Sequence, residues 1–152
     1  MSGDLEPISR VLDNRLVLAV THVAGLGSLF ELGEWVPRDR PIPNPALSDQ
    51  QRAFRGSQSL YVRCRWTLDS PEHLVPEGMR FEDELQRMSV LDHLTGRRIL
   101  STAVPPRGLV INLDGELVLE LHLDHGKCTI SDMGTYWTFS ASTDGAVQPS
   151  EY

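Results

Sequence analysis

The clearest hydrophobic pattern in the chain is an alternation of apolar and polar residues beside Asp114-Gly115. Leucine recurs at every second position from 117 to 123, so these side chains leave one face of an extended strand together. Residues 108–113 form a second apolar run. The Asp-Gly pair supplies the positive φ that a tight reversal needs. The pattern therefore predicts a β-hairpin over residues 108–123.

The register of this hairpin follows from the loop length that keeps one face apolar. A two-residue loop would pair Leu113 with Glu116 and would leave Leu117 opposite Asn112, which mixes apolar and polar residues on one face. A three-residue loop from Asp114 to Glu116 gives apolar pairs along the core face. These pairs are Leu113 with Leu117, Ile111 with Leu119, and Leu109 with Leu121. We therefore predict the longer loop, with His122 directed away from the core.

Other runs rich in β-branched or alternating residues predict the remaining strands. They cover residues 15–23, 28–35, 59–68, 97–104, 128–131 and 135–140. The run at 59–68 carries apolar residues on one face and polar residues on the other, which is typical of an antiparallel sheet with one wet face. A turn at Gly126-Lys127 is expected to separate the hairpin from the strand at 128–131.

One segment has the period of a helix. Apolar side chains three or four positions apart form a single stripe, and they are Phe81, Leu85, Met88, Leu91 and Leu94. The sequence therefore predicts an α+β fold that is mostly β, with six to eight largely antiparallel strands. We expect these strands to form a half-open barrel or sandwich, with one amphipathic helix near 81–94.

The length of 152 residues is enough for one domain with its own core. We expect residues 1–140 to form a single β-rich domain and residues 141–152, which are small and polar, to form a flexible tail. Residues 37–58 hold four prolines and several arginines and predict a long loop. Inside it, Asn44 as N-cap and Pro45 at the first helical position predict a short helix.

Two regions 83 positions apart resemble each other. The segment Arg15-Leu16-Val17 followed by Gly25-Leu26 matches the segment Arg98-Ile99-Leu100 followed by Gly108-Leu109. In each region a strand crosses into a glycine turn, returns, and is followed by another alternating strand. This repeat predicts two similar three-stranded units that share one core.

The charge distribution limits the classes of partner. A net charge of −7 argues against nucleic acid or an anionic membrane as the main partner. Residues 35–65 nevertheless hold six arginines and two aspartates, so this part is suited to an acidic partner. No apolar run approaches the length of roughly 18 residues needed to span a membrane. The polar N-terminus lacks the order of a secretory signal, so we expect a cytoplasmic protein with two free thiols, Cys64 and Cys128.

Metal-binding chemistry is suggested by one cluster, which consists of His122, Asp124, His125 and Cys128. Imidazole, carboxylate and thiolate groups are the usual zinc donors. The segment is similar to the end of the His-x-His-x-Asp-His signature of metallo-β-lactamase-like hydrolases, but Glu120 stands at the first His and the alternating βα pattern is missing. A small metal-binding protein or metal-dependent hydrolase is therefore the alternative hypothesis. No nucleophile elbow or phosphate-binding loop is found, and we predict no catalytic residue and no cofactor.

Protein binding is the leading functional hypothesis. Aromatic and arginine side chains are enriched in recognition surfaces, and the candidates are Trp35, Arg38, Arg40, Arg52, Arg55, Tyr136 and Trp137. The expected partner is a protein with an acidic surface. A carrier for a small apolar ligand inside the barrel is a third hypothesis, and exposed edge strands would also allow a homodimer.

A set of short motifs in order resembles an uncharacterised family of short bacterial β-rich proteins. They are Phe30-Glu31-Leu32-Gly33, Cys64-Arg65-Trp66, Asp114-Gly115 and a last strand that contains Trp137. Proteins of this general pattern are similar to immunity proteins that neutralise toxins. The resemblance implies a protein that binds another protein and has no catalytic activity.

Overall fold

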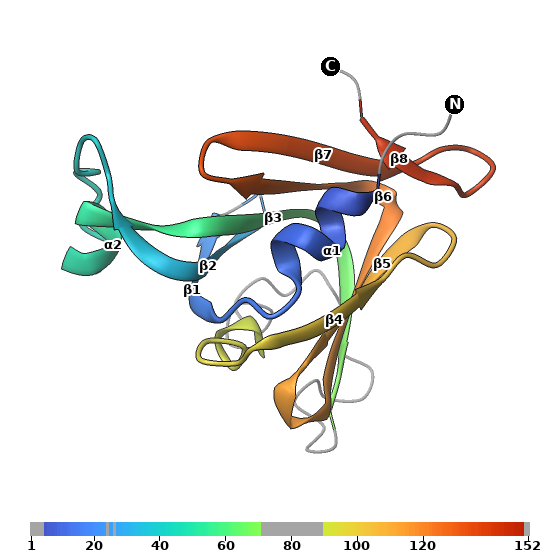
Figure 1. Ribbon diagram of the computed structural model, residues 1–152, viewed down its shortest axis with the longest axis horizontal. Coiled ribbons are helices and arrows are strands. Elements are labelled where there is room, and N and C mark those ends of the chain that lie inside the picture. Colours follow the sequence, from blue (N-terminus) through green and yellow to red (C-terminus); the bar gives the residue numbers. More distant parts are fainter. Residues whose placement is uncertain (1–4, 24, 26, 71–89, 151–152) are drawn as a thin grey trace.

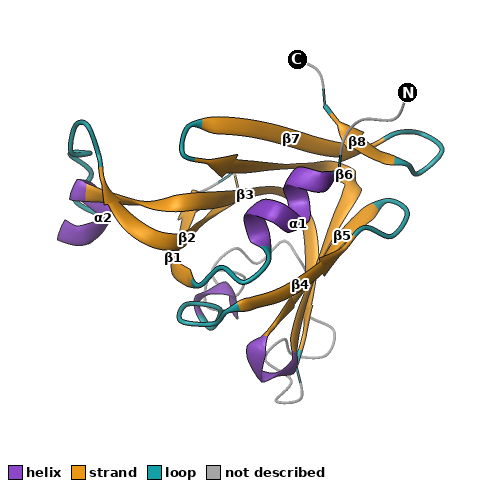
Figure 2. Ribbon diagram, in the orientation of Figure 1, coloured by secondary structure: helices purple, strands orange, loops and turns teal. Residues whose placement is uncertain are grey.

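The computed structural model describes residues 5–23, 25, 27–70 and 90–150. These residues form eight strands (Figures 1 and 2): β1 (Val17–Val23), β2 (Gly27–Pro37), β3 (Phe54–Asp69), β4 (Ile99–Ala103), β5 (Gly108–Leu113), β6 (Leu117–Asp132), β7 (Thr135–Ala141) and β8 (Val147–Pro149). The labelled helices are α1 (Glu6–Leu12) and α2 (Asp49–Ala53), and a 3-10 turn covers Asp114–Glu116. The predicted α+β, mostly β class is confirmed.

The strands form one antiparallel sheet in the order β1-β2-β3-β6-β5-β4, and β7 and β8 continue it beside the second half of β6. The sheet curls so that its two edges meet, where Leu16 and Arg98 form a single antiparallel bridge. This arrangement is the half-open barrel of the prediction. The helix α1 packs on β4 and β6 (Figure 1) and adds three buried side chains to the core, Ile8, Val11 and Leu12.

The predicted hairpin register is confirmed. The pairs are Leu113 with Leu117, Ile111 with Leu119, and Leu109 with Leu121. The loop contains Gly115 at φ 75° and Glu116 at φ 63°, so the positive φ expected of Asp-Gly extends one residue further. His122 stands between two buried leucines and is itself only partly buried.

The predicted turn at Gly126-Lys127 is wrong. Strand β6 continues through it to Asp132, and its pairing with β3 jumps from Arg65–His122 to Cys64–Gly126. Three extra residues of β6, 123–125, form a bulge at this point, and Gly126 takes a φ of 139°. A bulge absorbs a glycine inside a strand without reversing the chain.

The predicted loop at 37–58 is shorter than expected. Pro37 still pairs with Phe54 at the ends of β2 and β3, because a strand terminus tolerates a missing N–H donor. The helix in this connection begins later than predicted. Asn44 accepts a hydrogen bond from the Ala46 N–H (3.0 Å) in a local turn, and Ser48 is the N-cap of α2.

Residues 141–150 do not form the predicted flexible tail. The chain reverses after β7, and β8 pairs with β7 through Ala141–Val147 and Ser140–Gln148. The turn is closed by Asp144, which accepts a hydrogen bond from the Ala146 N–H (3.0 Å). The last two residues of the chain and most of the helix predicted near 81–94 lie outside the described residues. Of that helix, Val90, Leu91 and Leu94 are described, and they are buried.

The two halves of the sheet are related by an approximate two-fold axis. The order β1-β2-β3-β6-β5-β4 reads as one three-stranded unit followed by the same unit reversed. Each unit has a β-bulge near the start of its first strand, between Val17 and Ala19 and between Ile99 and Ser101. The predicted repeat of two three-stranded units is therefore present.

The hydrogen bonds at the meeting edges fix the offset between the halves. The two-fold axis relates the hydrogen bond from Asn14 N–H to Ile99 O (2.7 Å) to the one from Gly96 N–H to Val17 O (2.8 Å). It likewise relates the bond from Ile99 N–H to Arg15 O to the one from Val17 N–H to Arg97 O (both 2.8 Å). The axis also exchanges Leu16 and Arg98, which form the single bridge. Equivalent residues at these edges are therefore 82 positions apart. The sequence match predicts an offset of 83 positions. Adjacent arginines at 97 and 98 explain the one-residue error, because Arg15 aligns with either by residue type.

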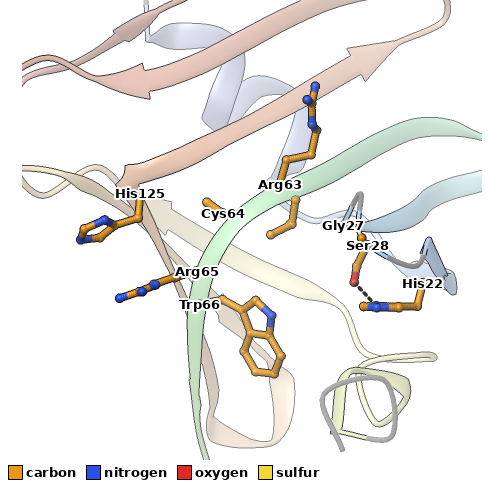
Figure 3. A pocket seen from close by; sticks show the side chains of 10 residues that line it. His22, Gly27, Ser28, Arg63, Cys64, Arg65, Trp66 and His125 are labelled. Atoms are coloured by element: carbon orange, nitrogen blue, oxygen red, sulfur yellow. Dashed lines mark hydrogen bonds between the residues drawn. The ribbon is translucent and has the colours of Figure 1, made fainter. Parts of the chain in front are cut away.

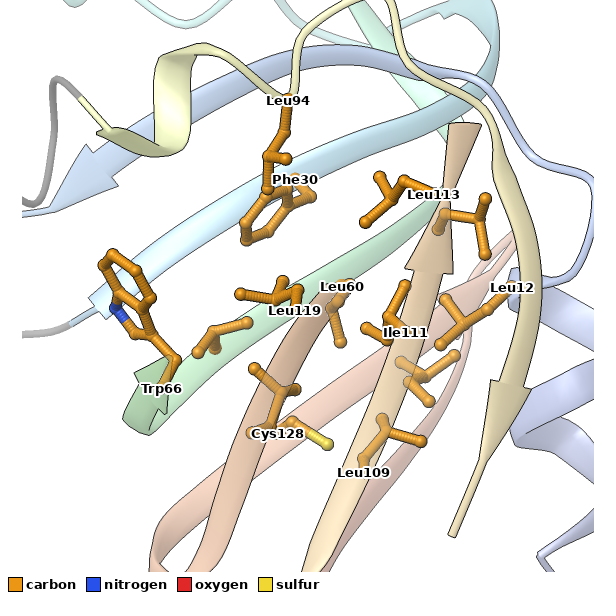
Figure 4. Packing of buried hydrophobic residues seen from close by; sticks show 14 of the residues in the cluster. Leu12, Phe30, Leu60, Trp66, Leu94, Leu109, Ile111, Leu113, Leu119 and Cys128 are labelled. Carbon is orange, nitrogen blue, oxygen red and sulfur yellow. The ribbon is translucent and has the colours of Figure 1, made fainter. Parts of the chain in front are cut away.

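The core is one contiguous cluster of buried apolar residues inside the curled sheet (Figure 4). Phe30 and Leu60 from the first half lie beside Ile111, Leu113 and Leu119 from the second half. Both halves therefore contribute to one core, as the repeat predicted. The packed side chains in Figure 4 occupy the region in which a carrier would hold an apolar ligand, so the core gives that hypothesis no support.

Both cysteines are free thiols. Burial raises the pKa of the Cys64 thiol to about 12 from an ordinary 9.0, and the nearby Asp124 carboxylate adds to the increase while a backbone hydrogen bond at His122 opposes it. Burial also raises the pKa of Cys128. Nucleophilic chemistry requires the thiolate, so neither thiol is suited to it near neutral pH.

These raised pKa values predict a loss of stability in alkaline solution. The folded state holds the thiol protons more tightly than the unfolded state, so stability is complete below the unfolded pKa and falls as pH rises toward the folded pKa. For each thiol, the free energy of unfolding should fall by on the order of 1 kcal/mol per pH unit above about pH 9. Urea unfolding at about pH 8 and about pH 10.5 measures this fall. A Cys64→Ala variant should show a smaller fall, and an equal fall would contradict the assignment to Cys64.

None of the helices within the described residues is long and apolar enough to cross a membrane.

Candidate functional site

The outer face of β2 carries a buried carboxylate. Alternation along this strand places Phe30 and Leu32 in the core, at 2% and 0% exposure, so Glu31 between them leaves the opposite face. Glu31 is nevertheless only 5% exposed. Buried charges normally need a partner, so the residues around Glu31 define a candidate functional site.

Glu31 has two partners. One carboxylate oxygen accepts a hydrogen bond from the backbone N–H of Gly56, and the other lies 3.6 Å from the Arg38 guanidinium. Arg38 Nε also donates to the carbonyl oxygen of Gln51 (3.0 Å). The carboxylate is therefore neutralised by an arginine that α2 holds in place.

The sequence explains why α2 is rigid enough to hold Arg38. Ser48 and Gln51 form a capping box, in which each side chain bonds the other residue's backbone N–H (3.1 and 3.2 Å). The Gln51 side chain also donates to Thr21 Oγ1 on β1 (2.9 Å). The short helix is thus tied both to its own first turn and to the sheet.

A hollow of about 210 Å³ lies over this ion pair on the outer face of β2, β3, β6 and β7. Its lining residues are Leu29, Glu31, Arg38, Arg55, Gly56, Ser59, Ser131 and Tyr136. The strand register explains the grouping, because Glu31 pairs with Ser59, Ser59 with Ser131, and Ser131 with Tyr136. One row of outward side chains thus crosses four strands.

Two groups of this hollow are available to a partner. The Arg55 guanidinium makes no hydrogen bond or ion pair within the part of the chain that the structure describes. Tyr136 is 68% exposed. The hydroxyl groups of Ser59 and Ser131, which line the same hollow, hydrogen-bond to each other. An unpaired cation, two hydroxyl groups and an exposed aromatic ring together suit a carboxylate.

The structure brings together three of the seven residues predicted to bind a partner, namely Arg38, Arg55 and Tyr136. Arg40 is exposed in the connection after β2 and does not line the hollow. Arg52 forms an ion pair with Asp49 in α2.

The two predicted tryptophans lie elsewhere. Trp35 is half-buried and pairs with Gly56, so strand alternation directs it to the face opposite Arg55. Trp137 packs against the core, and the Arg10 guanidinium of α1 lies 5.4 Å from its ring centroid.

The four residues of the metal hypothesis do not converge. Cys128 is fully buried in the core, while Asp124 and His125 stand exposed in the β6 bulge with 3.6 Å between Asp124 Oδ2 and His125 Nε2. His122 precedes the bulge, and strand alternation places it on the face opposite to the buried Leu121 and Leu123. Across the described residues, which include all four, no group of three or more such side chains is placed to hold a metal ion. The structure therefore does not bring these four side chains together.

Sequence reasoning missed Glu31, Ser59 and Ser131. Glu31 stands between two apolar residues in a strand, which reads as ordinary alternation, and only its burial marks it as unusual. The available signal was the polar face of the strand at 59–68, on which Ser59 lies beside the arginines.

Comparison with protein-family models gives no match, and comparison with curated proteins and with solved structures gives none either. The function is therefore argued from the geometry of the site.

Proposed function

We propose that this chain is a non-catalytic, cytoplasmic protein-binding domain, of an immunity-like or regulatory kind, whose partner presents an acidic surface. In this proposal an Asp or Glu side chain of the partner enters the hollow between β2 and β7 and pairs with Arg55. Tyr136 packs against the neighbouring surface of the partner. The observation that carries the proposal is that the unpaired Arg55 guanidinium and the exposed Tyr136 line one hollow. The Glu31 carboxylate in this hollow is already neutralised by Arg38.

Charge supports this assignment. The chain as a whole is acidic, at −7, but residues 35–65 carry six arginines against two aspartates. An acidic partner is therefore repelled by most of the surface and attracted to this part, which orients the encounter. Arg38 is engaged by Glu31, so Arg55 supplies the available charge at the hollow.

The second support is the absence of reactive groups around the hollow. Its polar side chains are an ion pair, two hydroxyls that bond each other, an arginine and a tyrosine. Among the described residues, none that lines the hollow is a histidine or a cysteine, the groups most often used as a base or nucleophile. The set is suited to recognition.

Charge reversal at Arg55 tests the proposal. Tagged wild-type protein and an Arg55→Glu variant are used as baits in native lysate, and captured proteins are quantified by mass spectrometry. We expect one acidic protein to be enriched by the wild type and reduced at least about tenfold with Arg55→Glu, because reversal places two like charges together. Tyr136→Ala should weaken capture in the same direction.

The matched control is Arg107→Glu, which reverses an exposed arginine in the connection between β4 and β5. It should retain the partner. Capture that is unchanged by Arg55→Glu, or no specific partner at all, would contradict the proposal.

A further inference from the structure

A second hollow lies at the margin of the sheet, where β2 begins and β3 continues beyond it (Figure 3). Its volume is about 280 Å³, close to the lower end of the range of small-molecule sites, about 300–1,000 Å³. Its lining residues are His22, Gly25, Gly27, Ser28, Val62, Arg63, Cys64, Arg65, Trp66 and His125. Because side chains alternate along β3, Val62, Cys64 and Trp66 reach the hollow from the core face, and Arg63 and Arg65 reach it from the other face.

A polar pair stands at one side of this hollow. His22 Nδ1 and Ser28 Oγ are 2.9 Å apart (Figure 3), and Ser28 is only 3% exposed. The other ring nitrogen, His22 Nε2, is buried and has no hydrogen-bond partner within the described chain. A buried polar atom without a partner destabilises the folded state, so this arrangement needs a reason other than folding.

The second half of the molecule provides an internal comparison. At the offset of the two-fold axis, His22 corresponds to Val104, which packs against the core. In the matching strand register, Ser28 corresponds to Leu109, which is fully buried. The same fold position is therefore apolar in the other half, and the scaffold does not require the His22–Ser28 pair.

The third lining strand shows the same contrast. Phe30 pairs with Leu60 in the first half as Ile111 pairs with Leu119 in the second, so Leu60 corresponds to Leu119. Four residues further along each strand, Cys64 corresponds to Leu123. Leu123 is 1% exposed, whereas Cys64 is only partly buried and borders the hollow. One half of the molecule thus fills this position with packed leucine, and the other leaves a hollow with polar groups.

The charge and shape of the lining point to one class of ligand. Arg63, Arg65 and His125 border the hollow, and none of the described residues that line it is Asp or Glu. Arg65 has no hydrogen bond or ion pair in the described residues, and Figure 3 shows it beside His125. Val62 and Trp66 provide an apolar wall, at 3% and 4% exposure.

We propose that this hollow at the start of β2 binds a small organic carboxylate with an apolar body. The carboxylate lies at the Arg65 and His125 side, and the apolar body packs against Trp66 and Val62. His22 contributes a ring nitrogen to a second polar atom of the ligand, such as the amide group of N-acetylphenylalanine. The proposal is independent of the protein-binding function, because the two hollows share no lining residue.

Phenylacetate and its neutral analogue phenylacetamide are suitable probes. Each is titrated into ¹⁵N-labelled protein, and the amide cross-peaks of residues 62–66 are followed. We expect saturable shifts with phenylacetate at a Kd below about 1 mM, and at least about tenfold weaker binding of the amide, because the charge-assisted contact to Arg65 is lost. N-acetylphenylalanine is a further arm, and tighter binding of it than of phenylacetate would identify a peptide C-terminus as the source of the carboxylate.

The decisive variant carries the residues of the second half, His22→Val with Ser28→Leu. It should unfold at an equal or higher denaturant concentration than the wild type and bind phenylacetate at least about tenfold more weakly. Arg65→Gln should remove the preference for the acid over the amide. His93→Val, an exposed histidine outside the hollow, should change neither property.

Three results would overturn the proposal. They are the absence of a saturable shift up to about 10 mM phenylacetate, equal affinity for phenylacetate and phenylacetamide, and a clearly lower unfolding midpoint of the double variant. The last result would show that the polar pair is structural.

Discussion

A Phe139→Ala variant is expected to lose about 3–5 kcal/mol of unfolding free energy. Phe139 is fully buried and among the largest side chains in the core, and its strand β7 pairs only with β6 and β8. Truncation removes apolar burial and leaves a cavity that the surrounding strands fill only partly. The measurement is urea or guanidinium unfolding followed by circular dichroism.

The control for Phe139 lies on the same strand. Tyr136 is 68% exposed, so Tyr136→Ala should change stability by no more than about 0.5 kcal/mol. A cost below about 1 kcal/mol for Phe139→Ala would show that β7 does not close the core as described.

Replacing Glu31 by alanine is expected to cost about 2–3 kcal/mol. Removal of one member of a buried ion pair typically costs about 3–5 kcal/mol because the other charge stays buried. Arg38 remains 19% exposed, so solvent relieves part of this penalty. The Gly56 N–H also loses its acceptor.

Two variants separate these contributions. Glu31→Gln retains an acceptor for Gly56 and removes only the charge, so it should cost less than Glu31→Ala. Glu34→Ala removes an exposed carboxylate three residues further along β2 and should be nearly neutral, within about 0.5 kcal/mol. Equal costs for Glu31→Ala and Glu34→Ala would mean that the buried ion pair is not formed in solution.

The strands were predictable where alternation was regular. The register of the hairpin at 108–123 followed from the need to keep one face apolar, and that requirement acts locally. The bulge at 123–125 was not predictable in the same way, because it depends on how β6 meets β3, a strand about 60 positions away. Gly126 was therefore read as a turn residue when it serves as a bulge residue.

The β7–β8 hairpin was missed although its signal was present. Asp144-Gly145 is the same dipeptide that marked the first hairpin, and Val147 after it is only 8% exposed. Small polar residues on either side gave the impression of a tail. The Asp-Gly dipeptide therefore indicated the hairpin better than the composition of the segment did.

The outer-face site was predictable only in part. Charge counting found Arg38 and Arg55, and the enrichment of aromatic rings in recognition surfaces found Tyr136. Residue type alone did not reveal that Trp137 packs beneath α1 or that Arg52 is engaged by Asp49. Glu31 became visible only through its burial and through its contacts with Arg38 and the Gly56 N–H.

The two-fold arrangement also distributes the entropy cost of folding unevenly. Pairs inside each half are local, as with Leu113 and Leu117, which are four positions apart. Pairs between the halves join distant parts of the chain, as with Gln58 and Asp132, which are 74 positions apart and hydrogen-bonded (3.0 Å). Closing a long loop restricts the chain before those contacts are formed. The β3–β6 junction therefore carries the largest share of the loop-closure entropy, while each half assembles from short-range hairpins.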